Sequence, residues 1–93
     1  MGVLHYGSHE CEFDDELLAH LQLVILKKIS ANEPFIISWR AGKESGTNRQ
    51  AILIDTGIPI RFEYCTDDLP TINNEWVVSL AVDANRPEGL SIY

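Results

Sequence analysis

The residues with the most suggestive chemistry surround a polar segment in the middle of the chain. Arg40, Lys43 and Arg49 frame the segment 41–48, and Trp39 stands directly before it. Guanidinium groups beside an aromatic ring suit an anion or a nucleic-acid backbone. A solvated hairpin tip is the plainer interpretation of the same residues. We therefore treat these three basic residues as a candidate anion or nucleic-acid contact.

The same segment contains two glycines and a lysine, Gly42, Lys43 and Gly46, which invites comparison with a phosphate-binding loop. A true phosphate loop carries its lysine after the second glycine and joins a strand to a helix. Here the lysine comes early and a strand is expected next, so the helix N-terminus that anchors phosphate is missing. The sequence favours a solvated hairpin.

Metal binding would have to draw on His5, His9, Cys11 and His20. A structural zinc site needs four converging ligands with tight spacing. A Gly-Ser turn separates the first two histidines, and His20 falls on a predicted helix, where it lies between apolar arcs or hydrogen-bonds into the sheet. We predict no metal and no cofactor. Cys11 and Cys65 form no motif and are expected to be reduced, partly buried thiols.

Hydrolytic chemistry has little support in the sequence. Ser38, His20 and a carboxylate would make a nucleophilic set, but there is no G-x-S-x-G elbow and Ser38 falls inside a predicted strand. The carboxylates at 14–16 are explained by the start of a helix, whose dipole favours negative charge there. We therefore predict no catalytic residue and expect a protein that is not an enzyme.

Composition and charge set broader bounds. A chain of 93 residues makes a single α+β domain, 1–93, and its 45% apolar share is that of a globular protein. No secretory signal or membrane span is recognisable, so a cytoplasmic protein without membrane contact is expected. The net charge of −7 disfavours general nucleic-acid binding. The region from Lys27 to Arg61 is nevertheless locally basic between two acidic ends, which suits docking onto a charged partner.

The elements follow from periodicity and from turn residues. Strict alternation over 58–64 predicts a strand with Ile58, Ile60, Phe62 and Tyr64 facing inward. The order is β-β-α-β-β-β-α-β, an α+β fold with an antiparallel-rich sheet and two helices packed on one face. The strands 35–39, 50–55 and 58–64 are expected to form a meander. The remaining elements are strands at 3–6, 10–13 and 90–93, a helix capped by Asp14, and a helix capped by Asn73 or Asn74 that carries the one-sided stripe Trp76, Val77, Leu80, Ala81 and Ala84.

The first helix is too apolar for a single buried face. One broad arc, suited to face the sheet, consists of Leu17, Leu18, Leu21, Val24, Ile25 and Ile29. A second arc on the other side consists of Ala19, Leu23 and Leu26. An ordinary surface helix has one stripe and a broad polar face. The second arc therefore needs a cover, which is either the later helix or a neighbouring chain.

Several segments resemble a family of small uncharacterised actinobacterial proteins that gene catalogues often label ATP-dependent DNA ligases. The matching segments occur in the family's order and cover nearly the whole chain: 15–21, 33–39, 58–62, 73–76 and 84–90. The central loop departs from the family, and the chain stops at Tyr93, where members usually continue for a few residues. The resemblance supplies no mechanism. A nucleotidyl-transferring ligase needs a lysine in a Lys-x-Asp-Gly setting, which this chain lacks.

Three functions remain open. The first is a small interaction module, a homo-oligomer or the binder of another protein, that uses Ala19, Leu23 and Leu26. The second is a nucleic-acid accessory protein that uses Arg40, Lys43 and Arg49. The third, ranked last, is an enzyme, because a packed core leaves little room for a pocket with converging polar groups.

Overall fold

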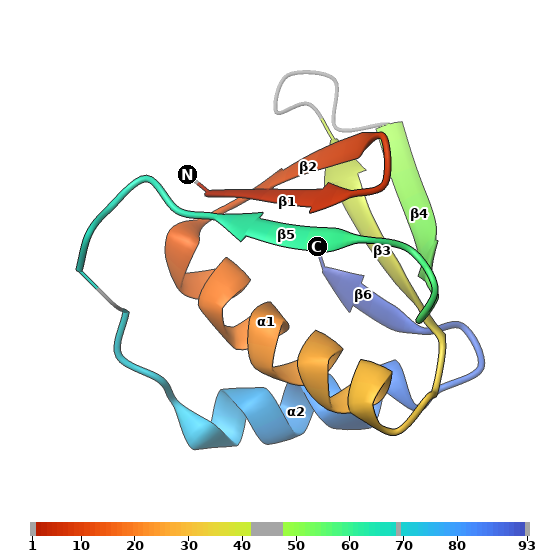
Figure 1. Cartoon of the computed structure of the whole chain (residues 1–93). Helices are drawn as coiled ribbons and strands as arrows, with labels where there is room; N and C mark the ends of the chain where they lie inside the picture. Colours follow the sequence, from red (N-terminus) through yellow and green to blue (C-terminus); the bar gives the residue numbers. More distant parts are fainter. Residues whose placement is uncertain (1, 42–47, 69, 93) are drawn as a thin grey trace.

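The computed structural model describes residues 2–41, 48–68 and 70–92 (Figure 1). In this part of the chain, strands and helices follow one another in the predicted order, and the α+β class is confirmed. Their bounds are β1 Gly2–Tyr6, β2 His9–Phe13, α1 Asp15–Ser30, β3 Phe35–Ala41, β4 Asn48–Ile54, β5 Ile60–Glu63, α2 Asn74–Ala84 and β6 Leu90–Ile92.

The described strands form two sheets rather than one. The first has the order β2-β1-β5 and is antiparallel throughout. The second has the order β4-β3-β6, in which β4 is antiparallel to β3 and β6 is parallel to it. Figure 1 shows β1, β2 and β5 side by side across the top of the molecule.

The predicted meander is wrong at its third strand, because β5 leaves β4 and pairs with β1, with Phe62 opposite Leu4. Hydrogen bonds tie the connecting segment to the end of β1. The Tyr6 hydroxyl accepts from the Asp55 amide at 2.6 Å, and the Gly7 amide donates to the Pro59 carbonyl at 3.0 Å. Ile60, Phe62 and Tyr64 pack against the core as expected, whereas Ile58 lies exposed in the connection.

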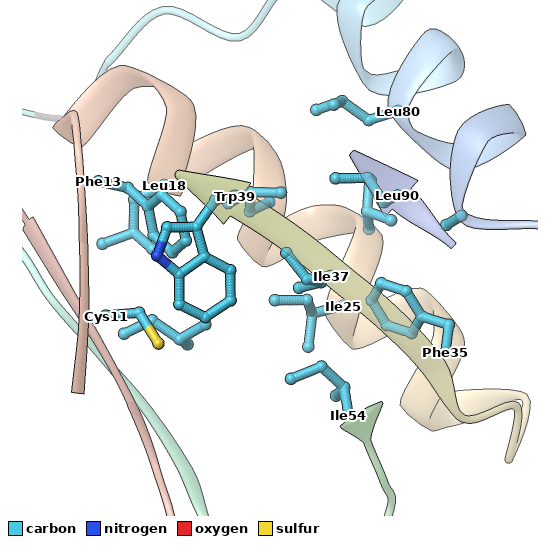
Figure 2. Close-up of a cluster of buried hydrophobic side chains, with 14 of the residues drawn as sticks. Cys11, Phe13, Leu18, Ile25, Phe35, Ile37, Trp39, Ile54, Leu80 and Leu90 are labelled. Carbon is cyan, nitrogen blue, oxygen red and sulfur yellow. The ribbon is translucent and has the colours of Figure 1, made fainter. Parts of the chain in front are cut away.

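The core lies between the two sheets and α1. Phe13 of the first sheet meets Trp39 of the second edge to face, with ring centroids 5.7 Å apart. Figure 2 shows Trp39 reaching toward Phe13 and Cys11, with Ile37 and Ile25 further along the same layer. Aromatic pairs in this geometry add to the stability that area burial provides. The two sheets are therefore held together by side chains from both.

The two helices lie next to each other on the same side of the strands (Figure 1). Asp15 and Glu16 occupy the first turn of α1, and Lys27 and Lys28 occupy its last turn, as the dipole favours. Asp14 stands at the predicted N-cap, but its side chain makes no capping hydrogen bond. In α2, the Asn73 side chain accepts from the amides of Glu75 and Trp76 and confirms the expected cap. Neither helix of the described chain has the length and apolarity needed to cross a membrane.

Candidate interaction surface

The second apolar arc of α1 is left open by α2. Leu23 and Leu26 are each 44% exposed, and Ala19 is half-buried. The opposite arc is buried against the sheets through Leu18, Leu21, Val24 and Ile25, as the periodicity predicted. Within the described chain, the stripe Ala19, Leu23 and Leu26 is therefore an apolar surface in contact with solvent.

The second helix adds apolar surface that the sequence interpretation missed. Val78 is 62% exposed and Val82 is 55% exposed. The predicted stripe of α2 turns inward as expected, with Leu80 and Ala84 buried. The sequence did contain a sign of this surface. Val78 and Val82 fall outside the predicted apolar stripe of α2, and helix propensity does not favour β-branched residues at exposed positions.

A groove of about 280 Å³ runs between the two helices. Its apolar walls consist of Leu23, Val24, Val77, Val78, Ala81 and Val82. Its polar end contains Lys27, Lys28, Glu33 and Asn85. Lys28 is already engaged there, because its ammonium donates to the Glu33 carboxylate at 3.3 Å and to the Asn85 side chain. We call this feature the helix groove.

His20 joins the two helices beneath this surface. Its side chain is 1% exposed. Nδ1 lies 2.6 Å from the Glu16 carbonyl and donates to it, while Nε2 accepts from the Asn73 amide at 2.9 Å. The imidazole also packs on the Trp76 ring, with centroids 4.2 Å apart. His20 therefore bonds to the α2 cap rather than to the sheet.

The remaining histidines and the cysteines do not converge. His5 lies on the outer face of the first sheet, with Nε2 2.9 Å from Glu63 and Nδ1 3.6 Å from Glu10. Among the described residues, no group of three or more histidine, cysteine, aspartate or glutamate side chains is placed to hold a metal ion. Cys11 is buried, and this burial raises the pKa of its thiol, which disfavours the reactive thiolate. Cys65 is exposed rather than partly buried.

Ser38 and His20 are also kept apart. Phe35, Ile37 and Trp39 of β3 are buried on the inner face of the sheet, and Ser38 alternates with them onto the other face. His20 lies on the inner side, between the helices. Ser38 and His20 are therefore not placed to act together as a nucleophile and its base.

The basic hairpin is described only at its base. The register of β3 and β4 places Arg40 directly opposite Arg49. Lys43 and the rest of the segment 42–47, on which the phosphate-loop comparison rested, lie outside the described residues.

Comparison with known proteins identifies the family. Neither the curated proteins nor the solved structures contain a match to the chain. Residues 1–93 match a family described as Domain of unknown function (DUF7882). That match covers the strands, both helices and the surface between them, and the chain therefore belongs to this family of unknown function.

Proposed function

We propose that the protein is a non-enzymatic interaction module that self-associates through the exposed face of α1. The observation that carries this proposal is the solvent exposure of Leu23 and Leu26 on α1, together with the helix groove that Leu23 shares with the exposed Val78 and Val82. Contiguous apolar surface on a soluble domain marks an interaction site more often than isolated exposed residues do. The helix groove gives this surface a concave shape into which another helix can pack.

The polar groups of the helix groove support binding rather than catalysis. Aliphatic side chains make up its walls, and Lys28 is held by Glu33 and Asn85 instead of pointing freely into the groove. An enzyme site needs a nucleophile or an acid–base pair within hydrogen-bond reach of a substrate. The contacts described in the groove supply an apolar platform with a charged end.

The substitution Leu23→Glu tests the proposal. A carboxylate in the middle of the apolar stripe has to be desolvated on association, so we expect a dimer to become a folded monomer. Light scattering over a concentration series measures the mass, and circular dichroism checks the fold. Leu53→Glu is the matched control, because Leu53 is 54% exposed on β4 and belongs neither to the apolar stripe of α1 nor to the helix groove. A wild-type protein that stays monomeric at every concentration, or equal effects of the two variants, would contradict the proposal.

A second candidate function is nucleic-acid binding through Arg40, Lys43 and Arg49. The observation that favours it is the register, which opposes Arg40 and Arg49 directly across two strands. Two arginines at paired positions concentrate positive charge at the base of this hairpin, which suits contact with phosphate groups. The net charge of −7 opposes this function.

Binding of duplex DNA measured against salt tests this candidate. Three phosphate contacts predict roughly 40-fold weaker binding at 200 mM than at 50 mM salt. Arg49→Glu is expected to abolish binding, whereas Arg61→Glu, at an exposed arginine of β5, should leave it nearly unchanged. Absence of binding by the wild-type protein at low salt would end this candidate.

A further inference from the structure

We infer that the exposed side of α1 packs against α1 of a second copy of this chain beside the helix groove, with the two α1 helices antiparallel across a two-fold axis. The inference rests on the proposed self-association and adds the orientation of the two copies and the contacts that specify it. Three observations on the two helices carry it: residue spacing along α1, two exposed charges that pair with no described residue, and the common direction of α1 and α2.

The exposed side of α1 has the spacing of a coiled-coil seam. Glu16, Ala19, Leu23, Leu26 and Ser30 follow one another at alternating intervals of three and four. The polar residues Glu16 and Ser30 lie seven positions before and after Leu23, with Ala19 four positions before it and Leu26 three positions after it. An antiparallel copy therefore places Leu23 near its own counterpart. It also places the small Ala19 opposite the larger Leu26, so that the two ridges interlock.

Two exposed charges of opposite sign lie on the same side of α1. Glu16 and Lys27 are both exposed, and neither joins an ion pair with any other residue that the structure describes. Three turns separate them, about 16 Å along the helix axis, which is too far for them to pair within one chain. An antiparallel copy brings each charge close to the opposite charge of its counterpart. A parallel copy would instead place like charges together.

The second helix has the same polarity as α1. The two helices run in one direction, because the start of α2 meets His20 through Asn73 and its end meets Lys28 through Asn85. The first turns of both helices carry carboxylates, whereas at the other end Lys28 and Arg86 already pair with Glu33 and Asp83. Antiparallel docking of two copies opposes the dipoles of both helices.

The area needed for a stable dimer requires both helices. A specific interface covers roughly 800 Å² on each partner, more than one helix stripe offers. Leu23 belongs both to the seam and to the helix groove, so a second α1 packed on the seam extends its contact to the exposed Val78 and Val82. The two-fold axis repeats this contact, and the four helices then form one packed layer.

Charge reversal with rescue tests the orientation. In an antiparallel dimer, Glu16→Lys or Lys27→Glu turns two symmetry-related attractions into repulsions, and each should raise the dimer Kd roughly 30-fold. The double variant Glu16→Lys with Lys27→Glu restores both attractions, so its Kd should return to within about threefold of the wild-type value. Sedimentation equilibrium at low ionic strength measures all four proteins, because salt screens these contacts.

The rescue separates the interface from folding. Both reversals oppose the dipole of α1, so the double variant should be the least stable fold even though its dimer is restored. Single variants without effect on Kd, or a double variant weaker than either single, would overturn the antiparallel orientation while leaving Leu23-dependent self-association intact. A monomer at every concentration, or a dimer insensitive to Leu23→Glu, would overturn both proposals.

Disulfide trapping gives an independent readout of orientation. In a Cys65→Ser background, which removes the exposed thiol, a mixture of Glu16→Cys and Lys27→Cys should oxidise to the mixed dimer. Each variant alone should cross-link poorly. Cross-linking of each variant with itself, and little mixed product, would indicate a parallel pair and contradict the inference.

Discussion

Gly89→Ala is expected to lower the free energy of unfolding by about 3 kcal/mol or more. Gly89 is buried between α2 and β6 and has a φ of +82°, in the left-handed region that glycine tolerates. A Cβ atom at this position would lie 2.8 Å from Cβ of Ile36 and would overlap the Ile36 carbonyl oxygen. Because the conflict is with the backbone of β3, no side-chain rotation relieves it. The substitution should displace β6 from β3.

Thermal and urea unfolding of the two proteins measure this effect. A loss of that size corresponds to a fall in Tm of about 12 °C or more for a domain of this length. Gly57→Ala is the matched control, since an added Cβ there meets nothing within 4 Å. We expect that control to be neutral or slightly stabilising. A Gly89→Ala protein as stable as Gly57→Ala would show that β6 can shift without loss.

The second large effect is expected at His20, where His20→Ala should cost about 3 to 4 kcal/mol. The imidazole fills a buried site on Trp76, so truncation leaves a cavity. It also leaves the Asn73 amide and the Glu16 carbonyl without their side-chain partner. His20→Phe keeps the ring volume and removes both polar atoms, so it should cost about half as much.

The difference between the two variants separates packing from hydrogen bonding. Chemical denaturation gives the free energies, and amide exchange at Glu75 and Trp76 reports whether the α2 cap loosens. His9→Ala, at an exposed histidine of β2, is the control and should change stability little. If His20→Phe proved as stable as wild type, the hydrogen bond from His20 to the α2 cap would carry no net stability.

Both positions support the proposed interaction surface from beneath. The missing side chain of Gly89 allows the backbone before β6 to lie close to Ile36 of β3. His20 connects the start of α2 to α1 through its hydrogen bond with the Asn73 amide. The separation of the two helices determines the width of the helix groove. Variants at either site should therefore weaken self-association at concentrations where the fold still persists.

Local patterns in the sequence determined the elements and the buried face of α1. Apolar residues at helical spacing, acidic residues in the first turn and basic residues in the last turn define Asp15–Ser30 from neighbouring residues alone. The Asn73 cap and the order in which strands and helices follow one another along the chain also depend on neighbouring residues. Leu23 and Leu26 could be recognised as a second apolar face of α1 for the same reason, because the face on which a helical residue lies depends only on its position along the helix.

Long-range contacts decided the rest. The alternation in Ile60–Glu63 predicts a strand but not its neighbour, and hydrogen bonds from Asp55 and Gly7 direct it to β1 instead of β4. The sequence placed His20 between two apolar arcs or in a hydrogen bond to the sheet, and it could not identify Asn73, far along the chain, as the buried partner. Whether α2 would cover Leu23 depended on the angle at which two distant helices pack. Strand pairing and side-chain burial depend on contacts between segments that are distant in sequence. Periodicity within one segment identifies its apolar face but does not identify the element that packs against that face.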